Sequence, residues 1–154
     1  MTTHAQRLAN LGITLPTPAK PVAAYIPARR AAGGLLFISG QLPMADGKLT
    51  ASGAVPSAVS PEDAKSAARL CAINAIAAAV AEVGSIDRIA GVVRVGVWVA
   101  SDAGFTGQPG VANGASDLLV QVFGDAGKHA RAAVGTNVLP LGTAVEVEVL
   151  FEVH

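Results

Sequence analysis

Two segments near the C-terminus carry side chains that could bind and transform a small carboxylate. Arg131 opens one apolar run, and Glu146 and Glu148 alternate with valines in the next. A guanidinium can pair with a carboxylate through two parallel hydrogen bonds, and a nearby glutamate can hold or move a proton. The alternation predicts that both glutamates face away from the valine side of a strand. A surface arginine and a polar sheet face would explain the same residues, so the pattern leaves both interpretations open.

Three further polar side chains have positions suited to a small-ligand site. Ser39 ends an apolar run before Gly40 and could hydrogen-bond a ligand. Tyr25 is the only tyrosine, and its amphipathic ring suits the wall of a pocket. Asn113 falls within a helical pattern although asparagine is a poor helix former, so it marks a polar contact or an irregular start. Each residue also has a purely structural explanation: Ser39 could form a turn, Tyr25 could simply be half-buried, and Asn113 could mark the start of a helix.

The sequence lacks the motifs of several other kinds of active site. Its glycine pairs have neither the spacing nor the lysine of a phosphate-binding loop. The three histidines are scattered, so no metal site is predicted. Ser39-Gly40 lacks the flanking glycine of a nucleophile elbow, and His129 would be the only candidate base for a serine hydrolase. The motifs therefore predict neither a metal site nor a phosphate-binding loop.

Composition predicts one folded domain. A chain of 154 residues fits one core, and 51% hydrophobic with 14% charged residues argues against disorder. A surface with so few charged residues favours self-association, although an alanine-rich composition would by itself give the same percentages of hydrophobic and charged residues. Zero net charge gives no basic footprint for nucleic acid or membrane surfaces. The single cysteine, Cys71, excludes an internal disulfide and is expected to be a buried hydrophobe.

Neither a targeting peptide nor a membrane span is predicted. The N-terminal residues lack the charged and apolar regions of a signal peptide. The apolar stretch 70–83 is too short to cross a bilayer and is mostly alanine. We therefore expect a soluble cytoplasmic protein.

The helices that must position the candidate residues are marked by caps and periodicity. A short helix over 3–11 is capped by Thr3 and stopped by Gly12. A longer helix begins after Ser60 and ends at Gly84, and the next covers 109–123. Their inward residues are predicted to be Leu70, Ile73, Ala77, Val80 and Val83 in the first, and Leu118, Leu119, Val122 and Phe123 in the second.

The predicted strands cover 22–31, 35–39, 89–100, 131–139 and 143–153, with a loop over 44–60. In the valine-rich third strand, Val93, Val95, Val97 and Val99 should share one face. Arg94, Gly96 and Trp98 should lie on the other face, a composition that favours a subunit interface but also fits a face turned to solvent. Hairpins are expected at both ends of the chain. The order β-β-α-β-α-β-β predicts an α+β fold with two helices packed on one face of a sheet.

The chain resembles the RidA/YjgF family of reactive-intermediate deaminases, once named L-PSP endoribonucleases. The resemblance rests on Gly34-Leu-Leu-Phe-Ile-Ser-Gly-Gln-Leu-Pro43, on Val95-Gly-Val-Trp-Val99 followed by Asp102, on the Arg131 strand, on Leu139-Pro140 and on Val145-Glu-Val-Glu148. It runs from about Val22 to the C-terminus. It implies a single RidA-like domain over 1–154, in which 1–21 form an N-terminal extension and 22–154 the core.

This resemblance implies a chorismate-mutase-like two-layer fold and a homotrimer with pockets between subunits. Better-studied members hydrolyse 2-imino acids or enamines to 2-keto acids and ammonia without a cofactor. By position, Arg131 matches the residue that binds the substrate carboxylate and Glu146 the residue that orients or activates water. Substrate-binding positions are matched by Tyr25, Ser39, Asn113 and the backbone of Ala133.

Ala133 departs from the cysteine that many deaminase members carry two residues after the arginine, so only its backbone can contact a substrate there. Substrate preference is therefore left open. The alternative is a non-enzymatic trimeric module that binds a small carboxylate metabolite. An endoribonuclease is disfavoured by the neutral charge and by the lack of a histidine pair or a basic aromatic groove.

Overall fold

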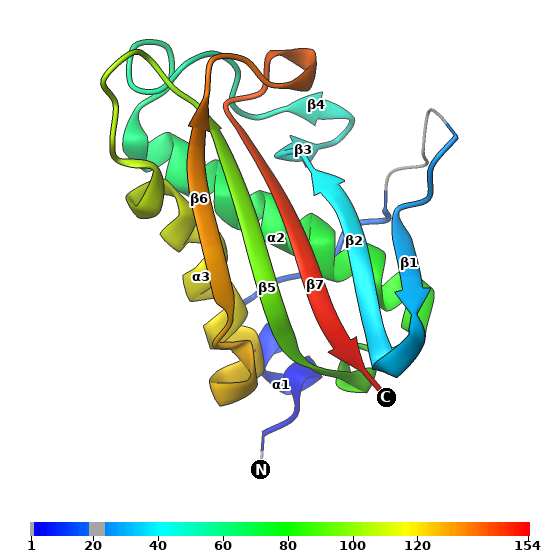
Figure 1. Cartoon of the computed structure of the whole chain (residues 1–154). Coiled ribbons are helices and arrows are strands. Elements are labelled where there is room, and N and C mark those ends of the chain that lie inside the picture. Colours follow the sequence, from blue (N-terminus) through cyan, green and yellow to red (C-terminus); the bar gives the residue numbers. More distant parts are fainter. Residues whose placement is uncertain (1, 19–23) are drawn as a thin grey trace.

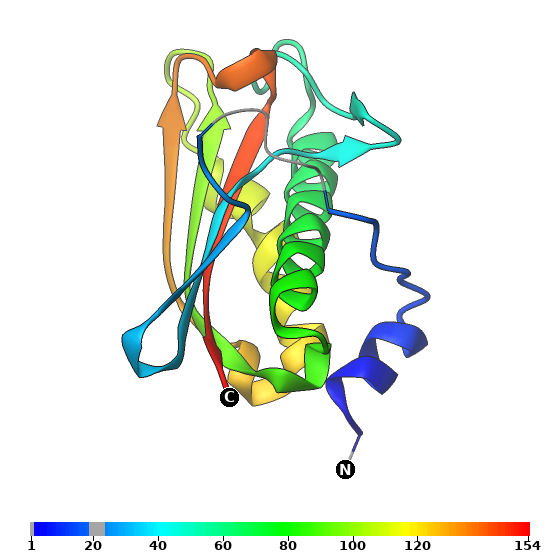
Figure 2. The same cartoon turned by 90° about the vertical axis from the view of Figure 1, so that its right-hand side faces the viewer.

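The computed structural model describes residues 2–18 and 24–154, in which a five-stranded sheet is covered on one face by helices (Figure 1). The elements are α1 (His4–Asn10), β1 (Ala28–Ala31), β2 (Leu35–Gln41), β3 (Met44–Ala45), β4 (Lys48–Leu49), α2 (Pro61–Val83), β5 (Ile89–Ala100), α3 (Gln108–Phe123), β6 (Ala130–Thr136) and β7 (Val145–Val153). The predicted α+β class and the order of the main elements are confirmed. The side view shows the two layers, with the sheet on the left and α2, in green, to its right (Figure 2).

The sheet order is β1-β2-β7-β5-β6, so the predicted hairpin of the last two strands is wrong. β7 runs between β2 and β5 and is antiparallel to both, whereas β6 lies at the edge and is parallel to β5. Two strands joined by a helix can pair in parallel because the helix returns the chain to the end of the sheet at which the first of the two strands began. Helix α3 makes that crossover, and the chain then returns to the centre of the sheet.

Several predicted boundaries shift in the structure. The first strand begins at Ala28, and residues 22 and 23 of its predicted range lie outside the described residues, as does the boundary between 21 and 22. β6 ends at Thr136 rather than at Leu139. The predicted loop 44–60 contains the small β3–β4 hairpin. The residue at which a strand ends is hard to predict, because it depends on where the neighbouring strand stops pairing, and the local sequence does not show which strand that is.

The caps of α2 are confirmed, but of its predicted inward residues only Ala77 and Val83 are buried. The Ser60 hydroxyl accepts from the Asp63 amide, and Gly84 ends the helix with a positive φ. Leu70, Ile73 and Val80 are only partly buried. The buried side consists of small residues around Ile76, namely Ala64, Ala67, Ala68, Cys71, Ala72, Ala75, Ala77, Ala78, Ala79 and Val83. Alanines let the helix backbone approach its neighbours closely, which turns the larger side chains to the flanks.

The predicted inward side of α3 is confirmed, because Leu118, Leu119, Val122 and Phe123 are all buried. The predicted N-terminal helix is confirmed as α1, with Thr3 as its N-cap. It packs on α3 through an edge-to-face contact between the His4 and Phe123 rings, whose centres are 4.9 Å apart. The extension is thereby attached to the helical layer.

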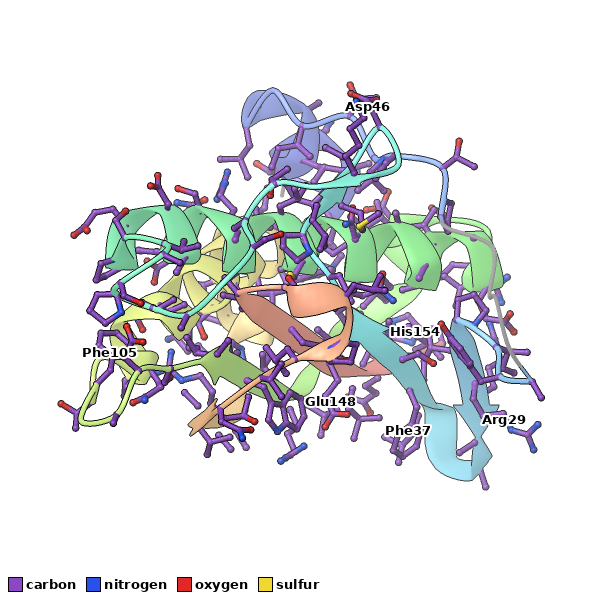
Figure 3. All side chains as sticks on the ribbon, turned by 90° about the horizontal axis from the view of Figure 1, so that it is seen from above. Arg29, Phe37, Asp46, Phe105, Glu148 and His154 are labelled. Carbon is purple, nitrogen blue, oxygen red and sulfur yellow. The ribbon has the colours of Figure 1, made fainter. Side chains whose placement is uncertain are left out.

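Three of the four valines predicted to share a face of β5 are buried beneath the helices, while Val93 is exposed. The register shifts between Val92 and Arg94, and this bulge turns Val93 outward. The opposite, open face carries the Trp98 ring over Gly96 and an ion pair of 3.0 Å between Arg94 Nη1 and Glu148 Oε1. Phe37 and Glu148 lie on this side, away from α2 (Figure 3).

Among the described residues, α2 has the length and hydropathy of a membrane span. With 23 residues it is longer than the stretch on which the prediction relied, so that length argument was wrong. More than half of its apolar window is buried against the sheet and α3. The apolar character of α2 is accordingly explained by its place in the core of an α+β domain.

Candidate functional site

The Arg131 guanidinium is held by neutral oxygen atoms of helix α3. Its Nη1 donates to Asn113 Oδ1 at 2.8 Å and to Ser116 Oγ at 3.2 Å. These acceptors come from one helix face because their positions are three apart. Arg131 is exposed, and within residues 2–18 and 24–154 no carboxylate forms an ion pair with it. A fixed guanidinium without an internal counter-charge is suited to bind an external carboxylate.

Ser116 and His129 are parts of this cluster that the sequence analysis missed in this role. His129 Nε2 lies 3.0 Å from Ser116 Oγ, and Nδ1 lies 2.6 Å from the carbonyl oxygen of Gly127. His129 was considered only as a possible hydrolase base. The available signal was the spacing of Asn113 and Ser116 on one helix face, together with a histidine two residues before Arg131.

Glu146 lies on the open face of the sheet, as predicted, because Val145 and Val147 on either side of it are buried beneath α2. Its carboxylate rests against the backbone of Gly40, where any Cβ would overlap it. Half-burial, with a smaller contribution from the negative charge of Glu148, raises the pKa of Glu146. A glutamate that takes up a proton more readily than usual is suited to accept and return a proton.

Tyr25 and Ser39 line a cavity of about 410 Å³ at the end of β2. Segment 16–18, the β3–β4 hairpin and the middle of α2 form its other walls. The Ser39 hydroxyl donates to the carbonyl oxygen of Ile26 at 2.7 Å, so its oxygen can still accept a hydrogen bond from a ligand. Tyr25 is exposed and can change its contacts on binding.

Ala133 is partly buried and follows Arg131 on the helix-facing side of β6. Its register partner in β5 is Val97, which is buried, and Arg131 pairs in the same way with buried Val95. The methyl group of Ala133 packs against the core. No thiol is therefore available beside Arg131.

The candidate residues form two groups that a single chain does not bring together. Arg131, Asn113 and Ala133 lie on the helix side of the edge strand β6. Glu146 lies on the open face of β7, and β5 separates β7 from β6. Ser39 precedes the glycine on which the Glu146 carboxylate rests, and both Ser39 and this glycine line the cavity that contains Tyr25, although Glu146 itself does not line it. One chain thus places the candidate residues in two groups that face in different directions.

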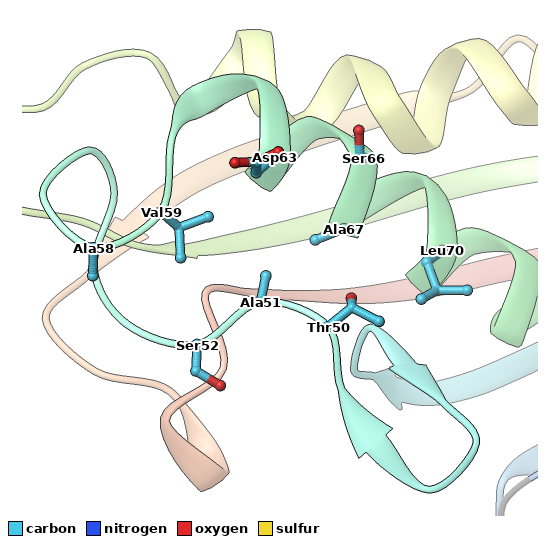
Figure 4. A pocket seen from close by; sticks show the side chains of 9 residues that line it. All are labelled: Thr50, Ala51, Ser52, Ala58, Val59, Asp63, Ser66, Ala67 and Leu70. Carbon is cyan, nitrogen blue, oxygen red and sulfur yellow. The ribbon is translucent and has the colours of Figure 1, made fainter.

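A second cavity, of about 510 Å³, lies at the start of α2 and contains none of the predicted residues (Figure 4). It is lined by Thr50, Ala51, Ser52, Ala58, Val59, Asp63, Ser66, Ala67 and Leu70. Its carboxylate, Asp63, already accepts the Ser60 hydroxyl. Among the described residues, no group of three histidine, cysteine or acidic side chains is gathered that could hold a metal ion.

Comparison with known proteins matches residues 5–153 to the family model "YjgF/chorismate mutase-like, putative endoribonuclease". Protein TCP17 of Trypanosoma cruzi is 42% identical over 151 residues, which cover 97% of this chain and 94% of that protein.

Two solved structures are similar over nearly the whole chain. Protein Atu1372 of Agrobacterium tumefaciens is 41% identical with a TM-score of 0.91, covering 98% of this chain and 92% of its own. A putative endoribonuclease of Shewanella oneidensis MR-1 is 32% identical with a TM-score of 0.93, covering 98% and 99%. TdcF of E. coli, solved with bound serine, is 18% identical with a TM-score of 0.62 over 90% and 94%, and shows the fold alone.

Proposed function

Because the chain belongs to the YjgF/chorismate mutase-like family, we propose that it hydrolyses small 2-imino acids, or their enamine tautomers, to 2-keto acids and ammonia. The observation that carries this proposal is the Arg131 guanidinium, which neutral oxygens of Asn113 and Ser116 hold in place. An arginine held by a carboxylate of its own chain would have its charge compensated. Held by an amide and a hydroxyl, Arg131 keeps its full charge for a ligand carboxylate.

The active site in this proposal lies between two copies of the chain. One copy contributes Arg131 from the sheet edge, and its neighbour contributes Glu146 with Tyr25 and Ser39. The exposed apolar side chains of the open sheet face, Phe37 and Val134, support association through this side. A closed ring of copies, which we expect to be a homotrimer in the cytoplasm, repeats the same pairing of the two groups at every interface.

The chemistry needs little beyond orientation and proton transfer. Arg131 binds the carboxylate and fixes the adjacent imine carbon. Glu146 takes a proton from water as its oxygen bonds to that carbon, and the C=N electron pair moves to nitrogen. The protonated Glu146 gives that proton to the nitrogen, then takes the proton of the new hydroxyl group and passes it to the same nitrogen, so that the C–N bond breaks and ammonia leaves as the C=O bond forms. The raised pKa of Glu146 favours a group that both accepts and returns a proton.

The alternative is a trimeric module that binds a small carboxylate without changing it. A protein of the same fold, E. coli TdcF, was solved with bound serine, so this fold can hold a small amino acid. This alternative requires Arg131 but not Glu146. RNA cleavage, which the names of relatives mention, requires neither.

The test is 2-iminopropanoate hydrolysis, with the imine generated by an amino-acid oxidase and its disappearance followed by semicarbazide trapping. We expect the wild type to accelerate hydrolysis and Arg131→Ala to lose at least about 10-fold in kcat/KM, since a charged hydrogen-bonded pair is removed. The matched control is Arg69→Ala. Arg69 also donates to a neutral acceptor, Gln121, but on the outer side of the helices.

Folding of both variants is checked by circular dichroism before the assay. Equal activity in Arg131→Ala and wild type would refute the role of the arginine. Carboxylate binding without hydrolysis across a panel of imines would favour the binding module, and cleavage of a short RNA by the wild type would favour the nuclease.

A further inference from the structure

With a neutral His129 ring, the hydrogen bonds behind Arg131 have one consistent direction. The Gly127 carbonyl can only accept, so His129 Nδ1, 2.6 Å away, carries a proton. In the neutral ring Nε2 is then an acceptor, and the Ser116 hydroxyl donates to it at 3.0 Å. The Ser116 oxygen is thereby left with its lone pairs for Arg131 Nη1, which lies 3.2 Å away and can only donate.

This chain of contacts begins at a fixed backbone group. Gly127 lies in the short 3-10 turn Gly124–Gly127, and any Cβ on it would overlap the backbone of Leu119 in α3. The turn is thus pressed against the helix that carries Ser116 and Asn113. His129 lies between this turn and the first residues of β6, so one ring links the turn, the helix and the strand.

We infer that Ser116 and His129 are positioning residues that hold the Arg131 guanidinium in the orientation that receives a substrate carboxylate. The inference rests on the proposed function. His129 sets the direction of the Ser116 hydroxyl, and Ser116 together with Asn113 occupies Nη1 of Arg131. Nη2 and Nε then remain as the pair of donors for the two carboxylate oxygens.

Ser116, His129 and the Gly127 carbonyl resemble the hydroxyl, imidazole and acceptor of a hydrolytic triad, because Ser116 and His129 are within hydrogen-bond distance. They are nevertheless unsuited to that chemistry. Ser116 lies inside α3, where the neighbouring backbone N–H groups are used by the helix. An acyl transfer site needs such N–H groups free to bind an oxyanion. The positioning role requires none of them.

The first measurement is nitrogen NMR of the wild-type protein labelled with 15N. Long-range proton–nitrogen correlation should show a protonated Nδ1 and an unprotonated Nε2 on His129, with His129→Gln used for assignment. Rotation of the Arg131 Nη1 group should be slowed by its two acceptors. It should accelerate in Ser116→Ala and His129→Leu and be slow again in Ser116→Thr, which restores the hydroxyl.

The second measurement is the affinity for pyruvate, a small 2-keto acid with the required carboxylate, by titration calorimetry. We expect the Kd to rise about 3- to 10-fold in Ser116→Ala and His129→Leu, the range expected for one lost hydrogen bond to a charged group. His129→Gln keeps an acceptor near the place of Nε2 and should lose less. Ser66→Ala is the matched control, since Ser66 is an exposed helix serine in α2.

In the imine assay the same loss should fall mainly on KM, because the carboxylate is bound equally before and during the reaction. A protonated Nε2, or unchanged Arg131 rotation and pyruvate affinity in Ser116→Ala, would overturn the inference. Pyruvate binding without imine hydrolysis would remove the proposed function and leave the positioning role intact. If the wild type binds no pyruvate, the rotation of Arg131 decides: faster rotation in Ser116→Ala supports the role, and unchanged rotation overturns it.

Discussion

Arg131 and Glu146 differ in how the fold treats their charges. The positive charge of Arg131 is exposed and supported by neutral acceptors, whereas the Glu146 carboxylate is half-buried against Gly40 and shares its face with Glu148. Both burial and the like charge disfavour the ionised form of Glu146. A residue kept in such surroundings lowers stability at neutral pH, which is typical of groups retained for function.

Replacing Glu146 by glutamine should therefore stabilise the protein at neutral pH. The folded pKa of Glu146 is raised, so the stability associated with its protonated form is fully present below the ordinary glutamate range and is lost as the pH rises through the raised value. Glutamine cannot ionise and escapes this loss. Because half of the side chain is solvated, we expect a gain of less than about 1 kcal/mol at pH 8.

Urea unfolding from pH 4 to pH 8 measures this difference, which should shrink toward the acid end. Glu152→Gln is the control, since Glu152 is an exposed residue of the same strand. A Glu146→Gln variant that is less stable than the wild type at pH 8 would contradict the account of this carboxylate. Its imine hydrolysis should fall although its stability rises.

At the scale of elements, the close approach of α2 and α3 is what places Asn113 and Ser116. The buried side of α2 is made largely of alanine, and Gly114 of α3 lies between the two candidate residues. A Cβ on Gly114 would overlap the carbonyl of Lys65 in α2, so only glycine permits this helix separation. The acceptors of Arg131 therefore depend on a helix contact that holds them over β6.

Gly114→Ala should separate the helices and destabilise the protein by about 1–3 kcal/mol, the usual cost of overpacking. Gly110→Ala in the same helix is the matched control, because nothing lies near its added methyl group. That control should gain up to about 1 kcal/mol from better helix propensity. Thermal unfolding of the two variants measures both effects, and a similar change in both would show that the helices are not in contact at Gly114.

At the scale of the whole molecule, the strand order separates Glu146 from Arg131 and leaves the two side chains on opposite faces of the sheet. β7 and β6 are separated by β5, Glu146 faces the open side of the sheet, and Arg131 faces α3. The side view shows the open side free of helices (Figure 2). If the proposed site forms between copies, each interface needs an intact Arg131 from one copy and an intact Glu146 from the next.

Two inactive variants should therefore complement each other. When Arg131→Ala and Glu146→Gln chains are unfolded together in equal amounts and refolded, about one quarter of the interfaces of a closed ring receive both intact residues. We expect about a quarter of wild-type imine hydrolysis from the mixture. Each variant refolded alone is the control and should stay inactive. No recovery in a mixture shown to contain mixed assemblies would place the whole site within one chain.

Local patterns predicted much of the fold and named most of the candidate residues. The caps at Ser60 and Gly84, the inward side of α3 and the outward direction of Glu146 follow from periodicity and from backbone preferences that neighbouring residues set. These are properties of a few consecutive residues, so they can be predicted without knowing the fold. The resemblance in motifs added the roles that we propose for Arg131 and Glu146, which physical patterns alone left open.

Which helices and strands pack together could not be predicted from local patterns. The insertion of β7 between β2 and β5, the alanine face of α2 and the bulge that exposes Val93 depend on pairing between distant segments. The same holds for the link from Gly127 through His129 and Ser116 to Arg131, which joins a turn, a helix and a strand. Such contacts form where the burial of distant surfaces outweighs local preference, and no short segment of sequence specifies its partner.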